Sequence, residues 1–144
     1  MDVIVRIAHP TETDRVRAVY QAFGYNRPIK PEDTVWLAEQ AGEAIGVVRI
    51  APESGTLVLR GMRIAERWQR RGVGTRMLFQ LVEWLGDREC YCLPYAHLIG
   101  FYRQVGFSEI TPAQSPAFLA ERYAEYRSQG LNVTVMRRRA SASG

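Results

Sequence analysis

The sequence predicts a mixed α/β fold in a single domain. Segments that alternate apolar and polar residues, as strands do, are interspersed with segments whose apolar residues recur at helical spacing. Short turns rich in glycine and proline separate them, and we find no internal repeat and no linker. The chain has 144 residues, 47% of them hydrophobic and 24% charged, as in an ordinary globular domain. We expect this domain to span residues 1–139 and residues 140–144 to form a flexible tail.

A strand and a helix are expected at the beginning of the chain. Residues 3–8 alternate in the manner of a strand. Thr11, with an acid three residues later at Asp14, is typical of a helix N-terminal cap. Gly24 ends the predicted helix, whose apolar residues share one face: Val16, Val19, Tyr20 and Phe23.

Three strands are expected next. Residues 25–33 contain two prolines and predict a loop. Strands are expected over residues 34–40 and 44–51, joined by a short hairpin turn at 41–43. A second turn then leads into a third strand over residues 56–64.

That third strand contains a phase slip. Leu57 and Leu59 share one face, but the apolar positions then resume at Met62 and Ile64, one residue out of step. A glycine at such a slip, here Gly61, is typical of a β-bulge. A bulge leaves backbone groups unpaired, so the sequence predicts a place where this strand could hold a ligand.

The clearest helix is expected over residues 72–85. Its apolar residues lie on one face, and Gly86 follows as a C-terminal cap. Ser115 followed by Pro116 is typical of the start of a later helix. The remaining expected elements are a strand at 89–93, a short helix at 98–104, a strand at 107–110, a helix at 116–128 and a strand at 131–137.

Cys90 and Cys92 are the two cysteines of the chain. Alternate side chains of a strand point to opposite faces, so no disulfide between them is expected. His9 and His97 show no recognisable metal-ligand spacing, and no metal is predicted. Two small buried thiols indicate a reducing compartment, and we expect a cytoplasmic protein, because neither a signal-peptide pattern nor a membrane-length apolar run is found.

Arginine makes up 18 of the 19 basic residues, and the formal net charge is +4. Arginine is suited to bidentate contacts with phosphate or carboxylate groups, although an arginine-rich proteome would give the same count. The run at residues 137–139 could bind RNA or a membrane surface. Three arginines without an aromatic platform are more typical of a solvated strand end, so neither partner is expected.

Residues 69–74, Gln-Arg-Arg-Gly-Val-Gly, predict an anion-binding turn at the start of the clearest helix. The first N–H groups of a helix have no partner within it, and the helix dipole adds positive potential. Gly72 and Gly74 leave room for a phosphate to approach the backbone. The segment is not a Walker loop, because no Gly-Lys-Ser/Thr follows it. It is not a dinucleotide-binding fingerprint either, because that motif requires a third glycine at position 77, where this chain has Met77. An ordinary glycine loop with surface arginines is the alternative; the arginines are Arg67, Arg70, Arg71 and Arg76.

With these residues the sequence resembles the GNAT superfamily of N-acetyltransferases. Residues 69–74 match its Gln/Arg-x-x-Gly-x-Gly/Ala signature, and residues 101–107 match its second signature, Phe-Tyr-x-x-x-Gly-Phe. The resemblance covers about residues 3–110, and the helix at 116–128 is a less typical addition. It implies a central mixed, mostly antiparallel sheet with a splayed, bulged fourth strand and helices on both faces.

The resemblance also implies roles for single residues. Acetyl-coenzyme A would be the co-substrate, and the acetyl group would pass by direct attack in a ternary complex to a primary amine of a small molecule, peptide or protein. Gln69 and Arg70 would support the turn, and Tyr102 would act as general acid toward the departing thiolate. Backbone groups of Met62 and Ile64 would contact the pantetheine arm and the thioester carbonyl. The pyrophosphate would be bound by the N–H groups of Arg71, Gly72, Val73, Gly74 and Thr75.

The sequence identifies no general base. Tyr95 occupies the position where the family often has asparagine. Four groups could take up a proton, but their spacing singles out none, and each is interpreted as a solvated surface group: Glu39, Glu66, His97 and Glu109. Two alternative functions therefore stay open, a non-catalytic acyl-coenzyme A-binding module and a basic nucleic-acid-binding domain. Tyr102 could likewise be a core aromatic residue, as we expect of Phe101 and Phe107.

Acceptor specificity in the resembling family lies in loops that correspond here to residues 20–35 and to the C-terminal segment. Neither carries a readable motif, so the acceptor, the acyl chain length and the oligomeric state, with a homodimer as one option, are not determined. In the helix at 116–128, the stripe of Leu119, Tyr123 and Tyr126 is interpreted as packing, with a wall of the acceptor site as the alternative.

Overall fold

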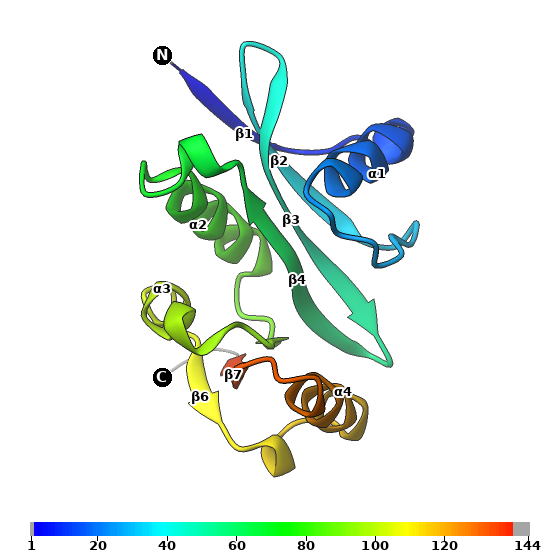
Figure 1. The fold of residues 1–144 in the computed structure, drawn as a ribbon, viewed down its shortest axis with the longest axis vertical. Coiled ribbons are helices and arrows are strands. Elements are labelled where there is room, and N and C mark those ends of the chain that lie inside the picture. Colours follow the sequence, from blue (N-terminus) through cyan, green and yellow to red (C-terminus); the bar gives the residue numbers. More distant parts are fainter. Residues whose placement is uncertain (1, 140–144) are drawn as a thin grey trace. The chain divides into compact units, whose positions relative to one another are not determined.

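The computed structural model describes residues 2–139, which form two compact units divided between Trp84 and Leu85. In the first unit four strands pair antiparallel in chain order (Figure 1). They are β1 (Val3–Ile7), β2 (Thr34–Gln40), β3 (Glu43–Glu53) and β4 (Thr56–Ile64), and the helices are α1 (Thr13–Ala22) and α2 (Val73–Leu85).

The two helices of the first unit cover opposite faces of its strands (Figure 1). On one face, Val16 and Tyr20 of α1 pack with residues of β2 and β3. On the other, the Trp84 ring of α2 meets the Trp36 ring edge-on at 5.3 Å between centroids. The amphipathic helices and the mixed α/β fold are therefore confirmed, as are the two tight hairpins, whose turns contain left-handed backbone at Ala41, Gly42, Ser54 and Gly55.

The start of the first helix differs from the prediction. Thr11 is not the cap: it lies inside a short 3₁₀ turn, Pro10–Glu12, that precedes α1. His9 caps this turn: its Nδ1 accepts the Thr11 N–H at 3.2 Å while Glu12 accepts the His9 N–H at 2.8 Å, and α1 itself begins after Glu12 without a side-chain cap. Histidine is an uncommon cap, so sequence preference pointed to the threonine instead.

The predicted bulge lies at Gly61. Arg49 of β3 is paired with Arg60, whereas Val47 is paired with Arg63, so Gly61 and Met62 together oppose one residue of β3. Directly paired residues share a face of the sheet. The extra residue therefore places Arg60 and Arg63 on the same face as Arg49 and Val47, which is the face covered by α1.

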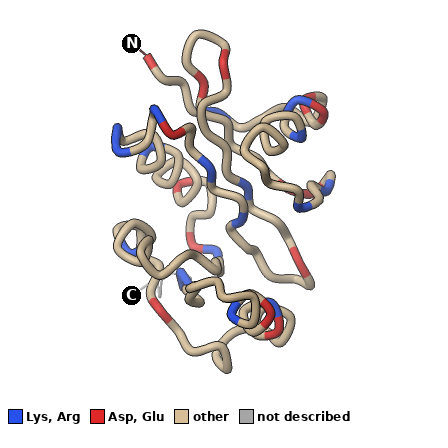
Figure 2. The backbone as a smooth tube through the Cα atoms, in the orientation of Figure 1, with Lys and Arg blue, Asp and Glu red and all other residues tan. Residues whose placement is uncertain are grey.

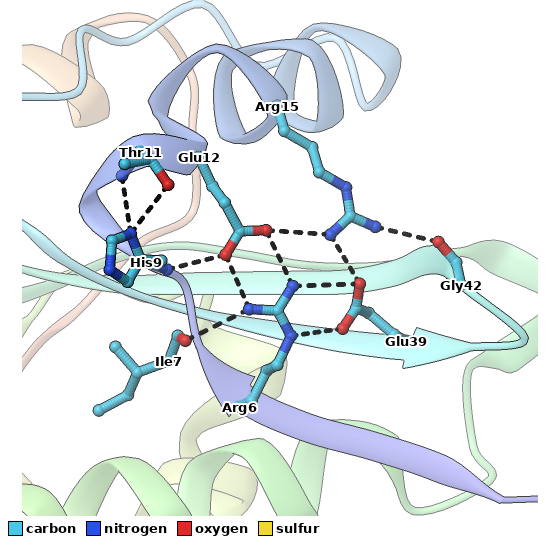
Figure 3. Close-up of polar contacts among 8 residues, drawn as sticks. All are labelled: Arg6, Ile7, His9, Thr11, Glu12, Arg15, Glu39 and Gly42. Carbon is cyan, nitrogen blue, oxygen red and sulfur yellow. Dashed lines mark hydrogen bonds and ion pairs between the residues drawn. The ribbon is translucent and has the colours of Figure 1, made fainter.

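A network of ion pairs joins β1, β2 and the start of α1 (Figure 3). The Arg6 guanidinium donates to Glu39 Oε1 at 2.6 Å and to both carboxylate oxygens of Glu12 at 2.8 Å. Arg15 contacts Glu39 Oε2 at 2.6 Å and donates to the Gly42 carbonyl at 3.0 Å. The hydrogen bonds from Arg6 hold the pKa of Glu12 and of Glu39 below the ordinary value.

The second unit contains three antiparallel strands in the order β5-β7-β6 (Figure 1). Ser115 does not cap the later helix, because its hydroxyl donates to the Pro112 carbonyl at 2.7 Å and the helix begins after Pro116 without a side-chain cap. The elements are β5 (Cys90–Cys92), α3 (Ile99–Arg103), β6 (Ser108–Ile110), α4 (Ala117–Ser128) and β7 (Val135–Arg138).

Arg138, the middle residue of the run at 137–139, is not simply solvated, contrary to the prediction, whereas Arg139 is exposed as expected. Arg138 donates from Nη1 to the Gly86 carbonyl at 2.8 Å and from Nε to the Val105 carbonyl at 3.1 Å. These bonds tie the strand to two loops of its own unit. Cys90 and Cys92 are buried and free, and burial raises the pKa of the Cys92 thiol well above its usual value.

Two expectations about the whole chain remain predictions. The division into compact units does not test whether residues 1–139 form one folding domain, and residues 140–144 lie outside the described part. Within residues 2–139, no helix is both long and apolar enough to cross a membrane.

We expect Gly61→Ala to lower the free energy of unfolding by about 2–4 kcal/mol. The φ of +64° disfavours any side chain, and an added Cβ would lie 2.6 Å from Tyr20 Oη and 2.8 Å from Arg49 Nη1. Gly55→Ala is the matched control, with φ of +75° and no atom within 4 Å, and should cost about 1 kcal/mol. Urea unfolding followed by circular dichroism measures both; equal losses would contradict the close packing at the bulge.

We expect Glu39→Gln to lower the free energy of unfolding by about 1–2 kcal/mol at pH 7, because Arg6 and Arg15 lose charged hydrogen-bond acceptors. The folded-state pKa of Glu39 is lowered, so its stabilisation is complete above its ordinary pKa of about 4.5 and is lost as the pH falls through the lower folded value.

The free energy of unfolding, measured with urea, should therefore differ between wild type and Glu39→Gln by a constant amount above pH 5. This difference should shrink below about pH 4.5. Asp14→Asn, which removes an exposed carboxylate paired with Arg17, is the control and should stay close to wild type. A difference between wild type and Glu39→Gln that does not change with pH would show that Glu39 acts by shape alone.

Candidate functional site

The predicted anion-binding turn joins β4 to α2. A short 3₁₀ turn, Glu66–Trp68, follows the strand, and the backbone then passes through left-handed conformations at Arg70 (φ 60°) and Gly72 (φ 82°). The Arg76 N–H donates to the Gly72 carbonyl at 3.1 Å, so the helix begins directly after the glycine. The N–H groups of Val73 and its two successors therefore have no acceptor within the helix. Figure 2 shows the basic positions that gather in this turn.

An open cavity of about 700 Å³ lies against this turn. The Arg71 guanidinium lies over the Trp68 ring, 4.7 Å from its centroid, and Arg76 Nη1 donates to the Val3 carbonyl at 2.7 Å. Two cationic groups are thus held in fixed positions beside the unpaired N–H groups. The lining residues are Asp2, Val3, Trp68, Arg71, Val73 and Arg76.

Gln69 connects the turn to the bulged strand, because its Nε2 donates to the Ile64 carbonyl at 3.0 Å. The Ala65 N–H donates to the Ile45 carbonyl, so Ile64 and its partner on β3 form a non-hydrogen-bonded pair. Backbone groups of Ile64 and of Met62, two residues earlier, therefore face the edge of β4 away from β3. The turn and this edge belong to one continuous backbone.

The predicted acid, Tyr102, lies on α3 in the second unit. Its side chain is 4% exposed, and its ring packs edge-to-face against Phe101 and Phe107, with centroid distances of 5.0 and 5.9 Å. Phe107 is fully buried, which confirms its predicted place in the core. Packing fixes the Tyr102 ring firmly, and its role as an acid stays a prediction.

Comparison with protein families identifies the relationship. The family model for the acetyltransferase (GNAT) family matches residues 4–107. The match covers more than half of the chain and contains both signature segments, 69–74 and 101–107. The chain belongs to the acetyltransferase (GNAT) family. The match ends before α4.

Solved structures of GNAT-type enzymes share the fold. Escherichia coli ElaA is 17% identical with a TM-score of 0.70, and the match covers 95% of this chain and 99% of that one. The ribosomal-protein-S18-alanine N-acetyltransferase from Escherichia coli is 16% identical with a TM-score of 0.69, and the match covers 99% and 97%. At these identities the likeness concerns the fold alone. No curated protein gives a sequence match.

N-acetylglutamate synthase from Neisseria gonorrhoeae, complexed with coenzyme A and N-acetyl-glutamate, is 18% identical to this GNAT chain with a TM-score of 0.67. The match covers 98% of this chain, which spans only about a third of that larger protein (36%).

In this GNAT chain the structure narrows the choice of a base. Glu39 is not a solvated surface group as predicted: its side chain is 13% exposed, and Arg6 and Arg15 hold its pKa low, which makes it a weak base. Glu109 accepts from the Thr134 hydroxyl at 3.3 Å and lies 3.6 Å from Arg103. His97 stacks on Tyr95 at 5.9 Å between centroids. None of these three is an unpartnered carboxylate or imidazole beside the turn, whereas the fourth candidate, Glu66, lies exposed in the 3₁₀ turn as predicted.

Sequence reasoning missed a second group of polar residues in the first unit. Arg49 is fully buried beside Tyr20, Tyr25 and Asp33, on the face of the sheet that α1 covers. The sequence did contain a signal, because Arg49 interrupts the apolar run of the second hairpin strand. A buried arginine requires partners, and these come from a loop that carries no motif.

We expect Gly72→Ala to weaken coenzyme A binding at least tenfold, since the methyl group occupies the space through which a phosphate approaches the backbone. No protein atom lies within 4 Å of the added Cβ, so the protein itself loses no packing. Gly86→Ala, also at positive φ (+58°) with no atom within 4 Å, is the control. Isothermal titration calorimetry with coenzyme A measures both; unchanged affinity in Gly72→Ala would remove this turn from the binding site.

Proposed function

We propose that this GNAT-family chain transfers the acetyl group of acetyl-coenzyme A to a primary amine of a small molecule, peptide or protein, by direct attack in a ternary complex. The observation that supports the proposal most is the turn before α2, where unpaired N–H groups, a glycine with open space and fixed arginines meet at one cavity. Such a turn provides what a pyrophosphate needs: backbone donors, positive charge and close approach.

Coenzyme A would be held by residues of the first unit. The backbone N–H groups of residues 71–75 would bind the pyrophosphate, with Gln69 and Arg70 supporting the shape of the turn. Arg71 and Arg76 add positive charge at the cavity wall. The edge of β4 at Met62 and Ile64 would receive the pantetheine arm, because their backbone groups face away from β3.

The reaction forms an amide bond and breaks a thioester bond. The lone pair of a neutral amine attacks the thioester carbonyl carbon, and a backbone N–H on the edge of β4 donates to the developing oxyanion. The C–S bond then breaks, and the leaving thiolate takes a proton from Tyr102, whose phenol ordinarily has a higher pKa than a thiol. The proton released by the amine passes to solvent and restores Tyr102. The products are an N-acetylated amine and coenzyme A.

A non-catalytic acyl-coenzyme A-binding module is the second candidate. It is favoured by the packing of Tyr102 between two phenylalanine rings and by the ion pairs that occupy Glu39. A nucleic-acid-binding domain is less well supported, because Arg138, the middle residue of the basic run, is occupied by two carbonyl groups. The buried free thiols agree with a protein of the reducing cytoplasm.

We expect Tyr102→Phe to lower kcat by about 10²-fold while leaving the Kd for acetyl-coenzyme A unchanged, because the substitution removes only the proton donor. Phe101→Leu, which alters the neighbouring ring and leaves the hydroxyl, is the control for packing. Thiol release with a panel of amines measures turnover, and calorimetry measures binding.

Acetyl-coenzyme A binding without turnover in wild type would favour the binding module. No binding at millimolar acetyl-coenzyme A would overturn the proposed function.

A further inference from the structure

We propose that the amine acceptor carries a carboxylate, which binds Arg63 above a buried floor formed by Arg49 and Tyr20. This inference deepens the proposed function and rests on it. The acceptor class would then be amino acids or other amines bearing one carboxylate. Arg63, Arg49 and Tyr20 all lie in the first unit.

Arg49 is held rigidly at the floor of this site. Its side chain is 0% exposed, and its Nε lies 3.3 Å from Asp33 Oδ2. Its Nη2 donates to the Pro28 carbonyl at 3.4 Å. The guanidinium also lies over the rings of Tyr20 and Tyr25, 5.3 and 5.2 Å from their centroids. These contacts fix the direction in which its remaining nitrogen, Nη1, points.

Two buried polar atoms meet at the bulge, and neither makes a hydrogen bond of good geometry with the described residues, although Arg49 and Tyr20 lie close enough to affect each other's pKa. They are Arg49 Nη1 and Tyr20 Oη, which lie 2.8 and 2.6 Å from the position that a Cβ on Gly61 would take. Buried donors without acceptors are unfavourable and uncommon in folded proteins. The bulge itself is closely packed, since a Cβ on Gly61 would approach both atoms too closely, so the two atoms form a buried floor and a ligand would meet Arg63 above it.

Arg63 provides a cation that solvent can reach. Its guanidinium lies over the Tyr25 ring at 4.9 Å, and its Nη1 donates to the Met62 carbonyl at 2.8 Å. The side chain is partly exposed, and no carboxylate of residues 2–139 lies within ion-pair distance of it. A guanidinium has five N–H donors and matches a carboxylate in geometry, so most of its donors remain for a ligand.

The charged groups around Arg63 indicate that its ligand carries a single negative charge. Arg49 and Arg63 carry two positive charges, and Asp33 supplies one negative charge, while Arg60 is already paired with Glu53 at 3.5 Å. Burial raises the pKa of Asp33, and the backbone hydrogen bond from Lys30 and the charge of Arg49 counteract that rise. One carboxylate on the ligand would neutralise the single net positive charge that these three side chains leave. A phosphate dianion would carry more negative charge than the site can neutralise.

The position fits the proposed chemistry. The Met62 carbonyl faces the edge of β4 away from β3, and the bond from Arg63 to this carbonyl brings the guanidinium to that edge. The same edge would receive the thioester. A carboxylate bound by Arg63 therefore places a nearby amine of the same molecule within reach of the carbonyl carbon.

The test compares carboxylates with their neutral isosteres. Acetyl transfer to the L-amino acids and to their α-carboxamides is measured by thiol release. In wild type, kcat/KM should be at least about 10²-fold higher for an accepted amino acid than for its carboxamide. Arg63→Gln should raise KM for the amino acid by about the same factor, reduce this discrimination and leave KM for acetyl-coenzyme A unchanged. Arg60→Gln removes the same charge from the same strand, where Glu53 already pairs with it, and should change KM less than threefold.

A binding experiment separates this inference from the proposed function. Thermal melts at equal ionic strength compare N-acetyl-L-amino acids with their carboxamides, which are stable product analogues. Stabilisation by the carboxylate alone, lost in Arg63→Gln and kept in Arg60→Gln, supports the site even if no transfer is found. Transfer that does not distinguish carboxylates from carboxamides, or that is equally affected in both variants, overturns the inference and leaves the acetyltransferase function intact.

Discussion

At Gly61 two residues of β4 stand opposite one residue of β3, and this extra residue decides which side chains face α1. With regular pairing, Arg63 would lie on the opposite face from Arg60. The bulge instead puts both on the face of Arg49, and the backbone of Met62 and Ile64 is directed toward the edge of β4 away from β3. A single backbone irregularity thus arranges both the edge proposed for the thioester and the cations proposed for the acceptor.

Placing Arg49 beneath α1 is costly unless the charge is compensated, because a buried cation loses its hydration. The loop between α1 and β2 supplies the compensation: the Asp33 carboxylate, the Pro28 carbonyl and the face of Tyr25. The compensation is incomplete, since Nη1 makes no hydrogen bond of good geometry with the described residues. The loop therefore has two roles, to complete the core of the first unit and to orient a cation toward the bulge.

Local pattern was sufficient to predict most elements and the bulge, because alternation, helical spacing and turn residues act over a few neighbours. The His9 cap was missed because histidine is an uncommon cap, whereas the bonds of Arg138 and the burial of Arg49 were missed because they depend on partners distant in the sequence. The turn at residues 69–74 was recognised because the N–H groups that bind an anion at a helix N-terminus all belong to one short segment. Arg49 and Arg63 lie on different strands, and their side chains come together only when β3 and β4 pair.

The arginine-rich composition therefore has no single meaning. Arg6 and Arg15 join α1 to the sheet, and Arg138 joins β7 to two loops. These groups are occupied within the fold and explain much of the positive charge without any polyanionic partner. Among the described residues of the first unit, cationic groups without a carboxylate partner include those at the turn before α2 and Arg63, near the two ends of the segment from the bulge to the helix. That distribution suits a reaction with one anionic group on each substrate, a pyrophosphate at the helix and a carboxylate at the bulge.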